Sequence, residues 1–328
     1  MNGKFIISLD FELHWGVFDT LSLKQYQTNL SNVKNVIDKL LVLSNKYDIK
    51  LTFATVGFLF ADNKKEIKKF MPTLLPNYTD QNLNPYRLLN EIGDDEKMAP
   101  LHYSKSNIKL IKQTGNHEIG THTFSHYYCL ASGQNSSEFD EDLKSAKKIA
   151  DTMGIGLTSI VFPKNQINKQ HLEICKNNGI TNYRGAEKHN IYNYPNFNTK
   201  KKKLLRFIDN YINVSGYNTY PINNISKDSS GLINLPSSRF LRPYIPKLAF
   251  LEFLKIKRIQ KAMKHAAINN ELFHLWWHPH NFGANMNENF ENLENIFKTY
   301  ANLNKKHQFK SVTMTELASQ ILNNKSKS

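Results

Sequence analysis

The stretch from His117 to Cys129, which reads His-Glu-Ile-Gly-Thr-His-Thr-Phe-Ser-His-Tyr-Tyr-Cys, organises the rest of the chain. It places His122 and His126 four residues apart, directly after a run that is typical of a β-strand. Two imidazoles at this spacing face the same way on one helical turn and can together bind a divalent metal ion. A chain with 12 histidines also contains such pairs by chance, so two surface histidines beside a helix start are the alternative.

The first predicted strand supplies the other half of a metal site. Its apolar run, residues 4–9, leads into Asp10 and Glu12, which project to one side because alternate residues of a strand share a face. Two neighbouring carboxylates repel each other unless a cation or a shared proton lies between them. Two histidines and one carboxylate are a usual ligand set of a catalytic zinc site that keeps a position open for water. The second carboxylate is then free to act as a base.

Length and composition are those of an ordinary globular protein, with 328 residues, 40% of them hydrophobic and 22% charged. Asp10 and Glu12 fall where a signal peptide needs an unbroken apolar region, and no apolar run approaches the roughly 20 residues of a membrane span. Only two cysteines, Cys129 and Cys175, are present, which argues against a disulfide-rich secreted scaffold. We therefore expect a cytoplasmic protein.

The formal net charge of +15 suits an anionic partner such as nucleic acid, anionic lipid or acidic glycan. The lysines are spread along the chain and mixed with asparagine, which is typical of a solvated surface, so nucleic-acid binding is the less favoured interpretation. A peripheral contact with a membrane, or with a lipid-linked substrate, is the further expectation.

Strand and helix patterns alternate along the whole chain, so we expect a single α/β domain over residues 1–328. The predicted strands occupy residues 4–9, 50–56, 118–121, 158–162, 181–184, 231–235, 271–277 and 308–313. The predicted amphipathic helices include residues 26–40, 136–153, 169–178, 246–268 and 288–303. This alternation implies a parallel sheet or a barrel, with the active site at the C-terminal ends of the strands.

Three segments depart from the alternation. Residues 72–101, rich in proline and asparagine, and residues 190–230, rich in asparagine and tyrosine, are predicted to be irregular insertions within the domain. The first has the length of a lid or a substrate loop. Residues 323–328 form a lysine, serine and asparagine tail that is predicted to fray.

Four of these segments together resemble the NodB-type polysaccharide deacetylases, carbohydrate esterase family 4. The resemblance covers most of the chain and is closer to the branch found among bacterial surface-polysaccharide genes. Ser-Leu-Asp-Phe-Glu at 8–12 is similar to the first motif of the family, and Thr-Phe-Ala-Thr-Val-Gly at 52–57 to its second-strand signature. His-Thr-Phe-Ser-His at 122–126 is similar to the metal motif, and Leu-Trp-Trp-His-Pro at 275–279 to the last motif.

The resemblance implies an irregular (β/α)7 barrel, related to the TIM barrel, with long loop insertions. It implies that Asp10 is the general base and His278 the general acid. Glu12, His122 and His126 would bind a divalent metal, with Zn²⁺ the family expectation. From the residues alone the roles of the two carboxylates can be exchanged, and the same ligands also suit Fe(II), Co or Ni.

Two motifs of the family are altered here. The third normally carries an arginine that holds the base, but residues 161–166 read Val-Phe-Pro-Lys-Asn-Gln. Lys164 from this segment or Arg184 from a later strand is the candidate replacement, and both are candidate substrate contacts. The fourth motif, an Asp-Trp pair, has no clean counterpart, although residues 206–209 are a candidate.

Further candidate substrate contacts lie near the predicted site. Trp15 follows the carboxylates, with core packing as its alternative role. Arg239 and Arg242 occupy a loop suited to an anion or a sugar, with helix capping and surface charge as the alternative. His280 competes with His278 as the acid and otherwise binds substrate.

These observations predict a metal-dependent hydrolase that cleaves a carbon–nitrogen bond and removes the N-acetyl group from an amino sugar of a polysaccharide or its precursor. Its partner is then a carbohydrate. One alternative is a hydrolase of a cyclic imide, ureide or other small amide, which the missing arginine favours. The other is a non-catalytic glycan-binding module.

Overall fold

The structure is a computed structural model that describes residues 1–192 and 199–325. Within these ranges no helix is long and apolar enough to cross a membrane. The strands belong to one ten-stranded sheet. In chain order they are β1 (Lys4–Phe11), β2 (Thr52–Thr55), β3 (Glu118–Thr121), β4 (Ser159–Ile160), β5 (Asn182–Gly185), β6 (Tyr220–Pro221), β7 (Ile233–Pro236), β8 (Arg239–Phe240), β9 (Glu271–Trp277) and β10 (Lys310–Ser311).

The sheet closes into a barrel through the segment that carries β7 and β8. Strands β1, β2, β3, β4, β5 and β7 pair in parallel in that order. After a two-residue break the same segment continues as β8, which pairs in parallel with β9, and β9 pairs in parallel with β1. The ring positions are therefore β1, β2, β3, β4, β5, β7 with β8, and β9. This arrangement confirms the expected irregular (β/α)7 barrel.

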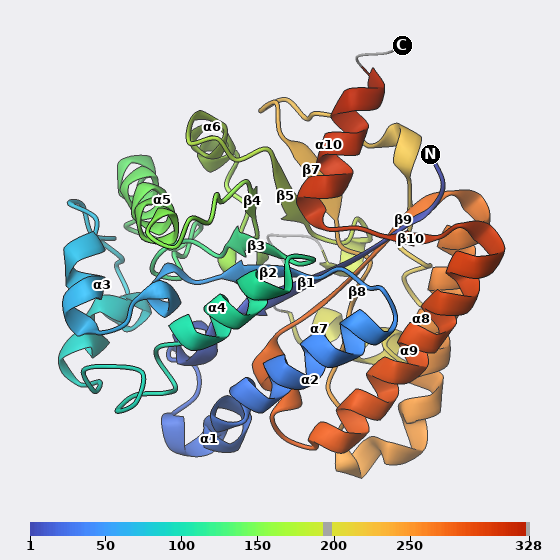
Figure 1. The fold of residues 1–328 in the computed structure, drawn as a ribbon, viewed down its shortest axis with the longest axis horizontal. Coiled ribbons are helices and arrows are strands. Elements are labelled where there is room, and N and C mark those ends of the chain that lie inside the picture. Colours follow the sequence, from blue (N-terminus) through green and yellow to red (C-terminus); the bar gives the residue numbers. More distant parts are fainter. Residues whose placement is uncertain (193–198, 326–328) are drawn as a thin grey trace.

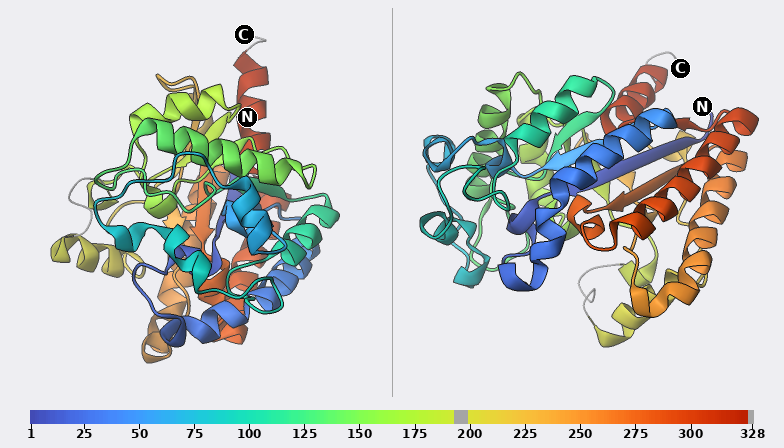
Figure 2. Two further views of the ribbon diagram at one scale, coloured as in Figure 1. Left: turned by 90° about the vertical axis from the view of Figure 1, so that its left-hand side faces the viewer. Right: turned by 60° about the horizontal axis from the view of Figure 1, so that its bottom comes forward.

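Helices surround the strands on the outside of the barrel (Figure 1). Views from two other directions show the same arrangement (Figure 2). The α-helices are α1 (Leu23–Ser31), α2 (Val33–Lys46), α3 (Lys64–Phe70), α4 (Lys105–Thr114), α5 (Ser136–Asp151), α6 (Lys169–Asn177), α7 (Lys200–Asp209), α8 (Glu252–Asn269), α9 (Met286–His307) and α10 (Met314–Lys325).

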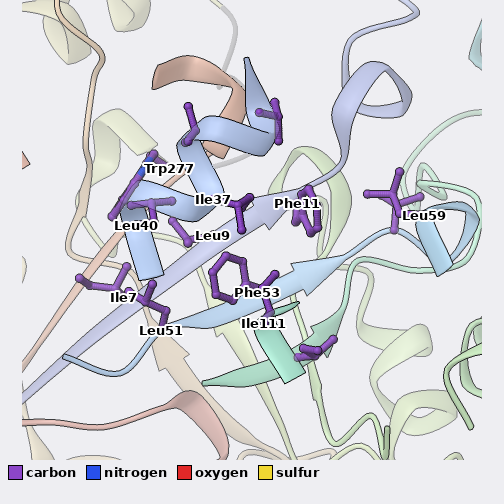
Figure 3. Packing of buried hydrophobic residues seen from close by; sticks show 14 of the residues in the cluster. Ile7, Leu9, Phe11, Ile37, Leu40, Leu51, Phe53, Leu59, Ile111 and Trp277 are labelled. Atoms are coloured by element: carbon purple, nitrogen blue, oxygen red, sulfur yellow. The ribbon is translucent and has the colours of Figure 1, made fainter. Parts of the chain in front are cut away.

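Alternation along β1 separates the outer core from the barrel interior. Ile7, Leu9 and Phe11 point outward and pack against α2, as Figure 3 shows. Ile6 belongs to a different apolar cluster, with residues of β7, β9 and α10. Ile6, Ser8 and Asp10 share one face of β1, because alternate residues of a strand point the same way. The Asp10 carboxylate therefore points into the barrel interior, at the C-terminal end of the strand.

Short 3-10 helices follow four of the barrel strands at this end. They are η1 (Leu13–Gly16) after β1, η2 (Gly57–Phe60) after β2, η5 (Pro163–Asn165) after β4 and η10 (Pro279–Phe282) after β9. Each turn bends the chain sharply beyond its strand. As a result, residues that directly follow these strands line the mouth of the barrel.

Two predicted helices differ from the observed ones. The expected helix 26–40 is broken at Asn32 into α1 and α2, because the Asn32 side chain donates hydrogen bonds to the carbonyls of Thr28 and Gly283. The expected helix 246–268 begins as a 3-10 turn, η9 (Pro246–Leu251), and only then continues as α8. Phe253, in the first turn of α8, is 64% exposed.

The segments predicted to be irregular contain some regular structure. Residues 72–101 hold two 3-10 helices, η3 (Gln81–Leu83) and η4 (Pro85–Asn90). Residues 190–230 contain η6 (Asn190–Tyr192), α7, β6 and η8 (Ile222–Asn224), although residues 193–198 lie outside the described part. Helix α10 continues to Lys325 into the predicted tail, and residues 326–328 are outside the description.

Candidate metal and catalytic site

The carboxylates of Asp10 and Glu12 lie at the C-terminal mouth of the barrel, and each residue is only 3% exposed. Asp10 lies within β1 beside Ala54 of β2, whereas Glu12 follows the strand and precedes η1. Gly16 lies close to Glu12, since a Cβ atom on this glycine would overlap the Glu12 carboxyl group. The strand end therefore fixes both acids.

The segment that carries the two histidines is a loop after β3, and not the helical turn expected from their spacing. Thr123 has a φ of 64° and His126 a φ of 59°, both in the left-handed region that side chains disfavour. The Thr123 hydroxyl accepts a hydrogen bond from the amide of Tyr127 at 2.7 Å, and the amide of Gly57 donates to the Thr123 carbonyl at 2.9 Å. These bonds hold the loop in its turn.

Asp142 of α5 anchors the same loop from beneath. Its fully buried carboxyl group accepts hydrogen bonds from the amides of Phe124 at 2.7 Å and Ser125 at 3.1 Å, and from the Ser125 hydroxyl. Burial raises the pKa of Asp142 to about 6, although these hydrogen bonds act in the opposite direction. Asp142 was not among the residues predicted from the sequence.

Glu12, His122 and His126 converge on one point. The Nε2 atoms of His122 and His126 each lie 3.2 Å from Oε2 of Glu12. One ligand atom from each residue falls within 4.8 Å of the others, and all three side chains are buried. This is a donor set that suits a divalent metal with an open coordination position.

The hydrogen bonding around His122 fits a metal ligand. Its Nδ1 lies 2.8 Å from the carbonyl oxygen of Val161, so this nitrogen carries the proton and Nε2 presents a lone pair to the cluster. Nε2 is buried and has no hydrogen-bond partner among the described residues. Burial lowers the pKa of His126 despite the nearby Glu12, which favours the neutral form that binds metals.

The pKa of Glu12 is lowered as well. Burial alone would raise it, but His278, His122 and His126 together outweigh burial and bring it well below the usual value. The carboxylate is therefore ionised, as a metal ligand must be.

Arg184 of β5 forms hydrogen bonds with Asp10 across the barrel interior. Its Nη1 and Nη2 atoms donate to Oδ1 and Oδ2 of Asp10 at 2.6 and 2.8 Å. Burial would raise the pKa of Asp10, but Arg184, followed by His122 and His278, lowers it overall. Nη2 of Arg184 also donates to Asn165 at 2.9 Å, and Nη1 to Ser8 at 3.0 Å.

Of the two candidates for the missing arginine, it is therefore Arg184 that contacts Asp10. Lys164 points elsewhere: its ammonium donates to the carbonyl of Gly16 at 3.1 Å and lies 3.4 Å from Asp19. It still lines the cleft that also contains Glu12 and His126.

His278 directly follows β9 and lies beside both carboxylates. Its Nε2 is 3.5 Å from Oε1 of Glu12 and 3.7 Å from Oδ2 of Asp10. Its Nδ1 lies 3.2 Å from Oδ1 of Asn281, whose amide donates to the hydroxyl of Tyr26 at 2.9 Å. His278 therefore faces the carboxylates with one nitrogen and is oriented through the other.

His280 lies deeper than His278. It is 2% exposed, and its Nε2 lies 4.0 Å from Oε1 of Glu12. Burial, with His278 nearby, lowers its pKa to about 3. The structure thus brings both histidines to the carboxylates, with His278 on the more accessible side.

A cleft of about 680 Å³ opens over this cluster. Asp10, Glu12, His126, His278 and His280 lie in its wall. Tyr26 from α1 and Leu83 from the 72–101 segment form part of its rim.

The predicted contact Trp15 does not reach this cleft. Its side chain is fully buried, its indole donates to the carbonyl of His102 at 2.8 Å, and its ring packs edge-on against Phe58. Trp15 is therefore a core residue, which corrects its assignment as a substrate contact. Arg239 and Arg242 line a second, adjoining cavity.

Several residues of the site gave little signal in the sequence. His274 of β9 places its Nε2 2.9 Å from the Ser8 hydroxyl, which also contacts Arg184. Asn165 completes the environment of Arg184. Asp142 is the exception, because an acid directly between Phe139 and Leu143 on the apolar face of a predicted helix indicates a buried partner.

Strained backbone conformations gather around the site. Besides Thr123 and His126, Leu13, Lys164 and Asn165 have φ values of 49°, 54° and 53°. Each such conformation costs about 1 to 3 kcal/mol and persists only where the surroundings fix it. The loops at the mouth of the barrel are thus held in conformations that local preference alone would not choose.

Comparison with known proteins places the chain in a family. The sequence model of the polysaccharide deacetylase family matches residues 17–183, just over half of the chain. No sequence among the curated proteins matches the chain.

Solved structures share the fold. A protein from Mycobacterium smegmatis, assigned as a polysaccharide deacetylase, superposes with a TM-score of 0.61 at 11% identity, over 99% of this chain and 92% of that one. The 4-alpha-glucanotransferase of Thermococcus litoralis gives 0.55 at 12% identity, over 98% of this chain and 41% of that one. The alpha-amylase AmyC of Thermotoga maritima gives 0.54 at 11% identity, over 97% and 75% of the two chains. At these identities the likeness concerns the fold, and the sequence match shows that the chain belongs to the polysaccharide deacetylase family.

Proposed function

We propose that the chain is a metal-dependent N-deacetylase that acts on an acetamido sugar of a polysaccharide or its precursor. The observation that supports this most is the position of Asp10 beside the cluster of Glu12, His122 and His126, with Nε2 of His278 3.7 Å from Asp10 and 3.5 Å from Glu12. An acid, a base and a metal-ligand set within one cleft are the groups that amide hydrolysis requires.

In this proposal Glu12, His122 and His126 hold the metal, most suitably Zn²⁺. When bound there, a divalent metal lowers the pKa of a water molecule and polarises the amide carbonyl. Asp10 then accepts the proton of the attacking water, because Arg184 keeps it ionised and oriented. His278 delivers a proton to the departing amine, and its contact with Asn281 sets the direction of its ring.

The geometry also bears on the two alternatives. The small-amide hydrolase was favoured by the missing arginine of the third motif, but Arg184 occupies the contact with Asp10. The open cleft of about 680 Å³ suits an extended sugar better than a small ring. A glycan-binding module without catalysis has no need for ionised Asp10 and accessible His278 beside the metal ligands.

We further propose that the reaction takes place on a surface-polysaccharide precursor at the cytoplasmic face of a membrane. Both cysteines are free and buried in the structure, which is consistent with a reducing compartment. Phe250 at the end of η9 and Phe253 in the first turn of α8 are 70% and 64% exposed, and exposed Lys257 and Lys261 follow Phe253 by one and two helical turns. Aromatic side chains beside lysines are suited to an anionic lipid surface.

Metal content and acetate release, measured together on the wild type and His126→Ala, test the proposed function. The substrates are a panel of N-acetylated glycans and one cyclic imide. We expect stoichiometric metal and acetate release from a glycan for the wild type, and loss of both in His126→Ala. Cleavage of the imide without acetate release from any glycan would favour the small-amide hydrolase, and bound metal without any turnover would favour the binding module.

A further inference from the structure

A second cavity adjoins the metal-site cleft. Its volume is about 190 Å³, well above the roughly 10–15 Å³ that a single water requires. The residues that line both spaces are Lys164, Asn165, Phe240, Trp276 and His278. A substrate that places its acetamide group beside His278 can therefore extend a neighbouring substituent into this cavity.

The lining of this cavity carries an excess of positive charge. Lys164, Arg206, Arg239 and Arg242 contribute cations, and among the described lining residues Glu187 is the one carboxylate. Glu187 is 5% exposed and accepts a hydrogen bond from the indole of Trp276 at 3.3 Å. Glu187 thus holds the indole ring in the wall, and its charge offsets one cation: burial lowers the pKa of Arg206, whereas Tyr192 and Glu187 raise it.

Arg239 is fixed by a carboxylate behind the wall. Asp209, fully buried, forms ion pairs with Arg239 and, at 3.4 Å, with Arg258. Burial would raise the pKa of Asp209, but Arg239 and the hydrogen bonds from Ser215 bring it to about 2. One carboxylate is thus shared between two guanidinium groups, so the cluster retains a positive charge.

Arg242 lies at the cavity without such compensation. It is partly buried, and its guanidinium carbon lies 5.5 Å from the centre of the Phe207 ring. Its Nε is buried without an acceptor, and the described residues provide no carboxylate partner. A partly desolvated guanidinium group without a counter-charge is unfavourable, and an oxyanion supplies both the charge and the acceptors that it lacks.

Aromatic rings complete the wall on the side of the catalytic cleft. The rings of Phe240 and Trp276 lie 4.7 Å apart at an angle of 53°, and both rings lie within 6.0 Å of the His278 ring. Aromatic faces of this kind pack against the apolar faces of sugar rings. The cavity therefore combines a surface for a sugar ring with cations at its lining.

We propose that this cavity is a subsite for an oxyanion carried by the substrate, a carboxylate or a phosphate next to the acetamido sugar. Arg242 binds this group, and Arg206 and Arg239 contribute to the positive field around it. The inference rests on the proposed deacetylase function and narrows its substrate to an acidic glycan or a phosphate-linked sugar.

Three probe substrates separate these chemistries: a neutral N-acetylglucosamine oligomer, a hyaluronan tetrasaccharide that carries glucuronate carboxylates, and UDP-N-acetylglucosamine that carries a diphosphate. We expect the metal-loaded wild type to show a higher kcat/KM on one of the two anionic probes than on the neutral oligomer. The preferred probe then identifies the source of the oxyanion.

Arg242→Gln should lower the ratio of anionic to neutral kcat/KM by about 10- to 100-fold, the effect of losing a charge-assisted hydrogen-bond pair. Arg242→Lys, which keeps the charge, should restore part of that ratio. Lys109→Gln removes an exposed charge from α4 and serves as the matched control. Equal kcat/KM on all three probes, or a preference that Arg242→Gln leaves unchanged, overturns the inference.

Tryptophan fluorescence can report anion binding independently of catalysis, because Trp276 lines the cavity. It therefore separates failure of this inference from failure of the proposed function. Inorganic phosphate and glucuronate, added separately to the wild type, should alter the tryptophan emission, and Arg242→Gln should weaken the response about tenfold. Phosphate or glucuronate binding without acetate release from any probe keeps the subsite and rejects the deacetylase. Acetate release without any Arg242-dependent response to either anion keeps the deacetylase and rejects the subsite.

Discussion

Arg184 holds Asp10 with two hydrogen bonds, of 2.6 and 2.8 Å, although the two residues lie 174 positions apart in the chain. The pair spans the barrel from β5 to β1 and is buried at both ends. A bidentate contact fixes both the position and the plane of the carboxylate. The orientation of the proposed base therefore depends on the width of the barrel.

Replacement of this arginine should affect both activity and stability. Arg184→Gln leaves Asp10 as a buried charge without its partner, which costs about 3 to 5 kcal/mol of unfolding free energy. We expect kcat to fall by about 100-fold or more, since misplacement of a catalytic group by about 1 Å has that effect. Arg184→Lys keeps the positive charge but cannot bind both oxygens of Asp10, so its kcat and its stability should lie between those of the wild type and Arg184→Gln. Acetate-release kinetics with thermal unfolding measure both effects, and an unchanged kcat in Arg184→Gln would exclude this role.

The anchor of the metal loop can be tested through Asp142. Asp142→Asn keeps the shape of the side chain but turns an NH₂ group toward the donors of Phe124 or Ser125. We expect metal affinity to fall by about 10- to 100-fold, the usual effect of disturbing groups that orient metal ligands. Competition with a chromophoric chelator measures the change. Asp151→Asn, at the exposed end of the same helix, is the control and should bind metal like the wild type.

His278 and His280 should respond differently to substitution. His278→Gln removes the proposed acid, so kcat should fall by about 100- to 10,000-fold while the metal stays bound. His280→Gln removes a buried ring that lies 4.0 Å from Glu12, and we expect it to change metal retention more than the chemical step. Metal analysis and single-turnover acetate release on both variants separate the two roles. The reverse pattern would identify His280 as the acid.

His171 of α6 should contribute to sensitivity toward acid. Burial lowers its pKa to about 4, its ring stacks on Phe139, and neither ring nitrogen has a hydrogen-bond partner among the described residues. Between about pH 6.5 and 4 the unfolded chain binds a proton at this position and the folded protein does not, so stability falls as the pH falls.

His171→Phe should therefore reduce the pH dependence of the unfolding free energy in this range, by at most about 1.4 kcal/mol per pH unit. Urea unfolding at several pH values measures the slope. His307→Gln changes an exposed histidine and is the control. A steeper slope in His171→Phe would contradict the assignment of a neutral buried ring.

The proposed membrane contact predicts binding to vesicles that contain anionic lipid, and weaker binding at higher salt. Phe250→Ser combined with Phe253→Ser should lower the affinity about tenfold, because the two exposed rings then no longer insert. Val42→Ser alters an equally exposed apolar residue of α2 and controls for non-specific hydrophobic binding to vesicles. Co-sedimentation with anionic and with neutral vesicles measures the affinity of each variant. Equal binding to both kinds of vesicle would oppose a role for the lysines.

The sequence predicted the barrel because its strands are marked by apolar runs and its first strand by alternation. Asp10 and Glu12 follow from that alternation, and their approach to His122 and His126 follows from the common edge of parallel strands. The loop around the histidines was predicted as a helical turn, because spacing carries no information about the left-handed conformations of Thr123 and His126.

Long-range partners were harder to predict. The choice between Lys164 and Arg184 depends on how the barrel closes across its interior, which no local pattern encodes. Trp15 was assigned to the substrate because it follows the carboxylates, but the chain turns at Leu13 with a φ of 49°, and the indole is buried in the core. The break at Asn32 depends on a partner carbonyl of Gly283, some 250 residues away.

The strained loops at the mouth of the barrel have a consequence for protein engineering. The backbone at Lys164 and at Asn165 has a positive φ, which glycine adopts without a steric penalty. Relief of this backbone strain favours glycine at both positions, but glycine at position 165 would also remove the acceptor of a hydrogen bond from Arg184. In directed evolution of this enzyme, thermal tolerance and catalytic rate should be screened together, because at these positions they are expected to compete.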